Sequence, residues 1–309
     1  MRVLVLGAGG VGGYFGARLL EAGHDVAFLV RPARAAILER TGLRLYSSNG
    51  DFAQPVAAVT SIQPDSLYDL VLVSCKAYDL DSAVAAIAPA VTDETRVLPL
   101  LNGVRHLDVL DAAFGAARVL GGVCHISVTL EDNGSIRQFG ILQRLAFGAR
   151  DASSVPDVVR HGLVSLGEHV VESPTIMTAM WEKFAFIATL AGLSCLMRGA
   201  VGEIVATPEG VHLLRAMYAE CGQTARNCGH VLSAEAVADA ERILTASGSP
   251  LKASMLRDLE RSARTECEHI LGDLRARACG CALDTPLLAA ALAHLRVYEN
   301  ARQRGDSVR

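Results

Sequence analysis

The chain has 309 residues, a formal net charge of −4 and 51% apolar residues. This length exceeds what one hydrophobic core usually fills, so we expect two domains, each with enough apolar side chains for a core of its own. A slightly acidic chain lacks the positive field that binding to nucleic acid or to an anionic membrane requires. We therefore expect a small-molecule partner.

The composition also bears on cellular location and on metals. The first residues already form a predicted strand rather than a signal peptide, so we expect a cytoplasmic protein. The longest mostly apolar run, residues 184–197, is too short to span a bilayer and is interpreted as a buried core helix. The eight cysteines include no CxxC pair, so we interpret them as reduced thiols and predict neither disulfides nor a metal site.

The N-terminal stretch carries the strongest local signal. The all-apolar residues 3–6 predict a strand buried on both faces, which leads into Gly7-Ala8-Gly9-Gly10-Val11-Gly12 and then into a helical pattern. A side chain at Gly7 would block the tight turn, one at Gly9 would hold off a pyrophosphate, and one at Gly12 would separate helix from strand. The motif predicts a dinucleotide site; a plain structural turn is the alternative.

A second apolar run, residues 26–30, completes the βαβ unit that this motif requires. Arg31 follows it, about twenty residues after the glycines, where NAD-specific proteins carry an acidic residue for the ribose 2′-hydroxyl. A guanidinium suits a 2′-phosphate instead, so the predicted cofactor is NADP(H). The alternative is that Arg31 is a solvated residue in a loop.

Two later strands, residues 70–74 and 97–101, end just before Lys76 and Asn102. The carboxyl ends of parallel strands are where an open α/β sheet binds its ligands, so both residues are candidates; each could equally be a cap or a turn residue. Asn49-Gly50 predicts a hairpin that leaves the main sheet. Further strands are expected at residues 119–130, 136–139, 144–147 and 169–171, and a helix at 155–166.

Ser173-Pro174-Thr175 is the predicted linker, because proline breaks regular structure and strand patterns end there. The predicted fold is therefore α/β: a Rossmann-like doubly wound sheet domain over residues 1–173, followed by an all-α helical domain over residues 174–309. Helices of the second domain are expected at residues 176–197, 209–230, 233–245, 254–278 and 286–302.

Lys183 stands inside the mostly apolar helix that begins at Ile176. A charge in such surroundings is unfavourable unless it is paired or faces a cleft, so Lys183 is a candidate functional residue. The alternative is a lysine whose stem lies along the apolar surface while its head reaches water. Periodicity alone does not single out Glu266 among the charges of the predicted helix 254–278.

These and further motifs follow one another through both predicted domains: the glycine motif, Arg31, Cys75-Lys76-Ala77, Leu101-Asn102-Gly103, Trp181-x-Lys183, and Ser254-Met255-x-x-Asp258 with Arg264-Thr265-Glu266. Taken together they resemble the ketopantoate reductase (2-dehydropantoate 2-reductase) family. The resemblance implies NADPH-dependent reduction of a 2-oxo acid to the 2-hydroxy acid and a role in pantothenate biosynthesis.

The resemblance also implies roles for individual residues. Residues Gly7, Ala8, Gly9, Gly10, Val11 and Gly12 would hold the pyrophosphate, Arg31 and Lys76 the 2′-phosphate side, and Asn102, Ser127 and Glu266 the nicotinamide half. Lys183 would be the proton donor, with Glu266 as the second catalytic residue. Asn102 and Lys183 would contact the substrate, and Ser254 would bind its carboxylate.

The sequence departs from the family on the helix of Lys183. The family presents asparagines one and two turns beyond the lysine, whereas this chain has Ile187 and Ala191, and a further polar position is Val201. Residues at i, i+4 and i+8 share a helix face, so the predicted substrate lining is apolar. Lost hydrogen-bond partners change substrate discrimination strongly. We therefore expect a paralogue that acts on a more apolar 2-oxo acid or a related ketone.

Two other functions stay open on the sequence alone. One is a non-catalytic NADPH-binding sensor, against which the presence of Lys183 and Glu266 argues. The other is a hydroxyacid or opine-type dehydrogenase that acts on another substrate. Both a monomer and a homodimer are compatible with the sequence.

Overall fold

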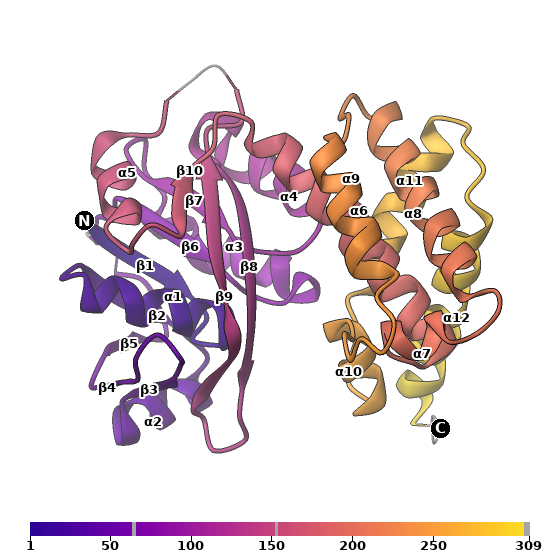
Figure 1. Cartoon of the computed structure of the whole chain (residues 1–309). Helices are drawn as coiled ribbons and strands as arrows, with labels where there is room; N and C mark the ends of the chain where they lie inside the picture. The colour runs from indigo at the N-terminus through magenta and orange to yellow at the C-terminus, as the bar shows by residue number, and fades with distance from the viewer. Residues whose placement is uncertain (64–65, 152–153, 306–309) are drawn as a thin grey trace. The chain divides into compact units, whose positions relative to one another are not determined.

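A computed structural model describes residues 1–63, 66–151 and 154–305. The chain forms two compact units, Met1–Met177 and Thr178–Arg309. The N-terminal unit combines sheets with helices, whereas the C-terminal unit is helical (Figure 1). This is the predicted fold class.

The first sheet of the N-terminal unit is parallel, with strand order β5-β2-β1-β6-β7 in the described part of the chain. Strand β1 is central, with Val3 paired to Val26 of β2 on one side and to Leu70 of β6 on the other. The strands that follow β1 in the chain are therefore added first on one side of it and then on the other. The point where the strand order reverses is where Rossmann-like sheets bind ligands. The strands are β1 (Arg2–Leu6), β2 (Asp25–Leu29), β5 (Ala57–Val59), β6 (Leu70–Val73) and β7 (Arg96–Pro99).

The second sheet has the order β10-β9-β3-β4, and β8 pairs with β9. Strands β8 and β9 form a long antiparallel hairpin (Figure 1), whose register shifts between Ile126 and Ser127. The hairpin predicted around Asn49-Gly50 is confirmed as β3 and β4, and it belongs to this second sheet. The strands are β3 (Leu43–Tyr46), β4 (Phe52–Gln54), β8 (Gly121–Leu130), β9 (Ile136–Gly148) and β10 (Val170–Glu172).

Helix α1 (Gly10–Glu21) packs against strands of both sheets, which explains its glycines. A Cβ at Gly16 would overlap the ring of Phe28 in β2, and one at Gly13 would overlap Ile136 in β9. Small residues on both faces therefore let the helix approach both sheets. The other helices of this unit are α2 (Pro32–Thr41), α3 (Leu80–Ile87), α4 (Arg105–Phe114) and α5 (Asp157–Val164), with 3₁₀ turns η1 (Ala77–Asp79), η2 (Ala88–Ala90) and η3 (Ala116–Arg118).

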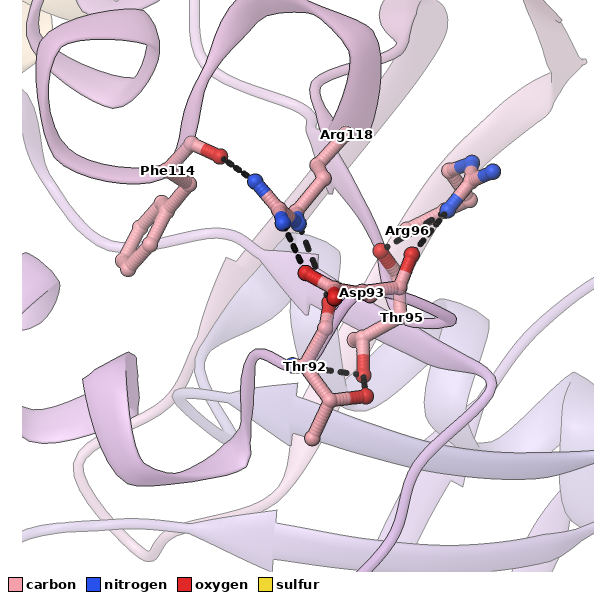
Figure 2. Close-up of polar contacts among 6 residues, drawn as sticks. All are labelled: Thr92, Asp93, Thr95, Arg96, Phe114 and Arg118. Atoms are coloured by element: carbon pink, nitrogen blue, oxygen red, sulfur yellow. Dashed lines mark hydrogen bonds and ion pairs between the residues drawn. The ribbon is translucent and has the colours of Figure 1, made fainter.

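A polar cluster holds the amino end of β7 (Figure 2). The fully buried Thr95 donates its hydroxyl to the carbonyl of Tyr68, 2.9 Å away. Its hydroxyl oxygen also accepts from the amide of Thr92 at 3.1 Å. Arg118 donates to the carbonyl of Phe114 at 2.6 Å and pairs with Asp93. Because buried polar groups need partners, this cluster stabilises the strand whose opposite end leads to Asn102.

Helix α6 (Ile176–Met197) lies almost entirely in the C-terminal unit and contributes many buried apolar side chains. Among the described helices, only α6 is long and apolar enough to qualify as a membrane span, with a mean hydropathy of 1.3, but 61% of its most apolar window is buried in the molecule. Such burial is typical of a core helix. The other helices are α7 (Val201–Val205), α8 (Gly210–Asn227), α9 (Ala234–Leu244), α10 (Ser254–Glu260), α11 (Asp273–Gly280) and α12 (Pro286–Arg304), with a π-helical turn η4 (Glu268–Gly272).

Arg31 is an exposed residue with extended backbone immediately before α2, for which it is the N-cap, so its position is compatible with both roles considered for it. One local prediction was wrong. The single helix predicted over residues 254–278 is instead α10, an irregular segment, the π-helical turn and α11. Ser262 breaks it with a left-handed φ of 55°, and contacts from α12 hold the segment that follows.

Candidate functional site

The glycine loop lies at the carboxyl end of the central strand β1. Gly7 has a φ of +91° and donates its amide to the carbonyl of Leu29, 2.9 Å away, which sets the sharp turn. A Cβ at Gly12 would overlap the carbonyl of Gly7 and the hydroxyl of Ser74, so helix and strand need glycine there. A Cβ at Gly9 would meet no heavy atom within 4 Å. The loop is therefore open to a ligand at Gly9 and closed to side chains at Gly12.

The start of α1 supplies hydrogen-bond donors to this opening. Gly9 is the N-cap of α1 and has no side-chain oxygen that could accept from the helix amides. The first hydrogen bond within the helix runs from the amide of Gly13 to the carbonyl of Gly9, at 2.9 Å. The amides of residues 10–12 therefore precede the internal ladder of the helix. Amides at a helix start attract anions, so the geometry suits a pyrophosphate.

Arg31 and Lys76 follow β2 and β6, the two strands that flank β1. The Arg31 side chain is 75% exposed, and its guanidinium lies 2.9 Å from the carboxylate of Asp79 at the end of η1. Lys76 is exposed and caps η1. The fold thus brings Arg31 next to the turn that Lys76 begins. Asp79 was not predicted, and nothing in the local sequence identifies it.

Arg34 was also missed. Its Nε donates to the carbonyl of Ala8 at 3.0 Å, so α2 is tied to the glycine loop. The proline at the first position of α2 was a usable signal, because it indicates a helix start that places Arg34 in the first turn.

Asn102 and Ser127 lie on separate elements of the N-terminal unit. Asn102 is half-buried between the end of β7 and the start of α4, as expected for a residue beyond a strand end. Ser127 is exposed on β8 at the register shift opposite β9, where it pairs with Phe139. Such irregularities re-aim side chains and are frequent beside binding sites.

Lys183, Ile187 and Ala191 follow one another at successive turns of α6. Lys183 and Ile187 are half-buried, whereas Ala191 is only 5% exposed. The face therefore runs from partly accessible at the lysine to buried at Ala191, and its members beyond the lysine are apolar.

Ser254 and Glu266 lie on either side of the break in the predicted long helix. Ser254 is exposed and is the first residue of α10. Glu266 is half-buried just before the π-helical turn, and its carbonyl accepts from the amides of His269 at 3.1 Å and Ile270 at 3.0 Å. Thr265 donates both its amide and its hydroxyl to Glu299 of α12, at 2.6 and 2.7 Å. π-Helical turns are frequent at functional sites.

Within the described residues, no group of three or more His, Cys, Asp or Glu side chains is arranged to hold a metal ion. The eight cysteines are free thiols, and burial raises the pKa of Cys195 and of Cys221 to about 12. Thiols with such pKa values stay protonated near neutral pH and are poor nucleophiles.

Both parts of the chain match models of known protein families. Residues 3–152 match the family model described as ketopantoate reductase PanE/ApbA, and residues 175–299 match the model of the C-terminal part of the same family. Together the two matches cover most of the chain.

The chain belongs to the ketopantoate reductase family. It is 35% identical over 302 residues to a Bacillus subtilis (strain 168) protein named "Uncharacterized oxidoreductase YkpB", covering 97% of this chain and 99% of that one. The crystal structure of a PanE/ApbA family ketopantoate reductase from Ralstonia eutropha JMP134 is 28% identical, with a TM-score of 0.87, and covers 98% of this chain and 100% of its own.

A second similar structure carries the name of a different enzyme. The ternary structure of D-mandelate dehydrogenase with NADH and anilino(oxo)acetate has a TM-score of 0.88 at 20% identity, covering 98% of this chain and 99% of that chain. At this identity the likeness concerns the fold. The ketopantoate reductase family therefore shares its fold with an enzyme that is named for another 2-hydroxy acid.

Proposed function

We propose that the protein is an NADPH-dependent reductase that converts a 2-oxo acid into the corresponding 2-hydroxy acid. Membership of an oxidoreductase family supports the reaction class. The observation that carries the cofactor assignment is the glycine loop, which is open at Gly9 and is followed, at the end of the next strand, by Arg31.

The residues of the N-terminal unit fit a dinucleotide. The amides at the start of α1 would hold the pyrophosphate, and Arg31 with Lys76 would hold the adenosine 2′-phosphate. Asn102 and Ser127 would contact the nicotinamide half. When bound, the reduced nicotinamide supplies a hydride to the keto carbon of the substrate.

Lys183 would complete the reduction. Its ammonium group would hydrogen-bond the keto oxygen, stabilise the negative charge that develops there and donate the proton that yields the hydroxyl. Glu266 would assist at the nicotinamide side, and Ser254 would hold the substrate carboxylate with its hydroxyl. The lysine returns to its charged state by taking a proton from water.

Ile187 supports an apolar substrate. A ketopantoate hydroxyl set against Ile187 would lose its hydrogen bonds with water without gaining a partner, which costs about 1 to 3 kcal/mol. A 2-oxo acid with a plain branched tail avoids that cost. We therefore propose a more apolar substrate than ketopantoate, and a cellular role outside pantothenate biosynthesis follows if that preference holds.

A matched pair of substrates tests this proposal. 3,3-Dimethyl-2-oxobutanoate is ketopantoate without its hydroxyl, so the ratio of their kcat/KM values isolates that group. We expect the wild-type enzyme to prefer the dimethyl acid, and Ile187→Asn to shift the ratio towards ketopantoate, whereas Ile187→Val should leave it nearly unchanged. A wild-type preference for ketopantoate would contradict the apolar pocket but not the reaction class.

The same assay separates the other candidate functions. Phenylglyoxylate is the 2-oxo acid that corresponds to mandelate, and it tests the alternative of a hydroxyacid dehydrogenase, for which the D-mandelate dehydrogenase structure supplies the example. Each substrate is assayed with NADPH and with NADH. Tight NADPH binding without turnover of any 2-oxo acid would favour the sensor. We further propose a cytoplasmic location, because eight free thiols suit a reducing compartment.

A further inference from the structure

Arg34 makes two directional contacts with backbone carbonyls. Its Nε donates to Ala8 of the glycine loop at 3.0 Å, and its Nη1 donates to Gly134, in the turn between β8 and β9, at 2.7 Å. Its third nitrogen, Nη2, is buried and makes no hydrogen bond with the described residues. One half-buried guanidinium therefore ties three segments together: the glycine loop, the first turn of α2 and the β8–β9 turn.

The contact with Ala8 determines where the next amide points. The peptide between Ala8 and Gly9 is trans, so its carbonyl and its N–H point in opposite directions. Because Arg34 holds the carbonyl, the N–H of Gly9 is directed away from Arg34. Gly9 is also the loop residue beside which the structure leaves open space.

The positive charge of Arg34 favours anion binding at the Gly9 amide, as the orientation of the peptide does. A cation at the carbonyl end of a peptide polarises it and makes its N–H a better donor to an anion. Burial lowers the pKa of Arg34, but a guanidinium stays protonated at physiological pH. A fixed positive charge thus lies next to the glycine loop, on the side opposite the Gly9 N–H, and adds to the field of the helix start.

The β8–β9 turn provides the second anchor. Gly134 has a φ of +83°, and a Cβ there would meet Ile37 of α2 at 2.8 Å and Nη1 of Arg34 at 3.0 Å. The turn therefore packs directly on α2 and on the guanidinium. Held at both ends, the Arg34 side chain has little freedom to swing towards a different partner.

We propose that Arg34 is a positioning residue for the dinucleotide: it orients the Ala8–Gly9 peptide so that the Gly9 amide binds the pyrophosphate, whether or not a 2′-phosphate is present. This proposal rests on the proposed function, because it assumes that the glycine loop binds a dinucleotide. It differs from the role given to Arg31, whose exposed guanidinium would select for the 2′-phosphate.

The test compares Arg34→Gln with Arg31→Gln and with Arg40→Gln, an exposed arginine in the last turn of α2 that serves as the charge-matched control. Dissociation constants are measured by calorimetry for NADPH, NADH and adenosine 2′-monophosphate, the last of which has no pyrophosphate. We expect Arg34→Gln to weaken NADPH and NADH equally, by about tenfold or more, and to spare adenosine 2′-monophosphate. Arg31→Gln should weaken NADPH and adenosine 2′-monophosphate and spare NADH.

Two further measurements separate positioning from folding. Arg34→Lys keeps the charge with fewer directed donors, so it should restore part of the lost affinity. A variant that merely unfolds the loop would lose affinity for all three ligands and would not be restored by lysine, which overturns the proposal. Loss confined to the ligands with a 2′-phosphate would also overturn it, because Arg34 would then be a second phosphate ligand. Wild-type protein that binds neither dinucleotide would instead refute the proposed function.

Discussion

The carboxylate of Asp79 lies 2.9 Å from the guanidinium of Arg31, and this ion pair joins the segments that follow the two strands flanking β1. Asp79 is less exposed than Arg31, at 29% against 75% of the side chain. The residue expected to select for a 2′-phosphate is therefore paired with a carboxylate before any phosphate arrives. We therefore expect that carboxylate to weaken any preference for NADPH that Arg31 produces.

Replacing Asp79 should consequently sharpen cofactor choice. In Asp79→Asn the 2′-phosphate no longer lies near a like charge, whose repulsion amounts to about 1 kcal/mol at 4 Å in water. NADPH should therefore bind about fivefold more tightly, whereas the affinity for NADH should stay unchanged. Asp81→Asn, which removes an exposed carboxylate in the first turn of α3, is the control. Weaker NADPH binding in Asp79→Asn would mean that Asp79 holds Arg31 in its binding position.

Lys183 should matter for turnover rather than for cofactor binding. Lys183→Ala is expected to lower kcat by about 10²- to 10⁴-fold, because the lysine is needed mainly in the transition state. The dissociation constant for NADPH should stay nearly constant. Single-turnover rates with saturating NADPH measure the effect directly. A decrease of less than tenfold would assign the proton to another group.

Glu299 should be a stability determinant for the segment that carries Glu266. Its carboxylate accepts from the amide and hydroxyl of Thr265 and is only 13% exposed. Glu299→Ala leaves these donors without their acceptor and should lower the free energy of unfolding by about 1 to 3 kcal/mol, measured by urea titration. Glu241→Ala, which removes an ion pair at the surface with Arg215, should change it little. Equal decreases in the free energy of unfolding for the two variants would show that the Thr265–Glu299 contact contributes no more to stability than the surface ion pair.

His230 should contribute to the pH dependence of stability. Its ring stacks on Trp181 with centroids 5.0 Å apart, and burial together with the charge of Arg277 lowers its pKa. The unfolded chain therefore binds the proton more readily, so this contribution is present above about pH 6.5 and is lost as pH falls through the folded-state pKa.

The melting temperature should accordingly fall between pH 7.5 and pH 5, and His230→Gln should make that decrease shallower. His212→Gln, at an exposed position of α8, is the control. A wild-type melting temperature that stays constant over this range would contradict the prediction.

Much of the fold could be predicted from local chemistry. The turn at Gly7 and the helix after Gly9 follow from the glycine motif behind an apolar strand, and the structure confirms both. Ser233 was expected to open a helix, and its hydroxyl accepts from the amide of Ala236 at 3.1 Å. Pro286 begins α12 as expected. In each case the residues that determine the structure are neighbours in the chain.

The sequence by itself determined the first βαβ unit with its glycine loop, the change from a sheet-containing part to a helical part, and the family, because caps, periodicity and short motifs depend on nearby residues. Only the tertiary structure decided that Arg34 binds the Ala8 carbonyl, that Arg31 pairs with Asp79 and that the helix expected through Glu266 is interrupted. Each of these depends on a partner far along the chain. A hydrogen bond between distant residues leaves no pattern in either segment, so it becomes visible only when packing brings donor and acceptor together.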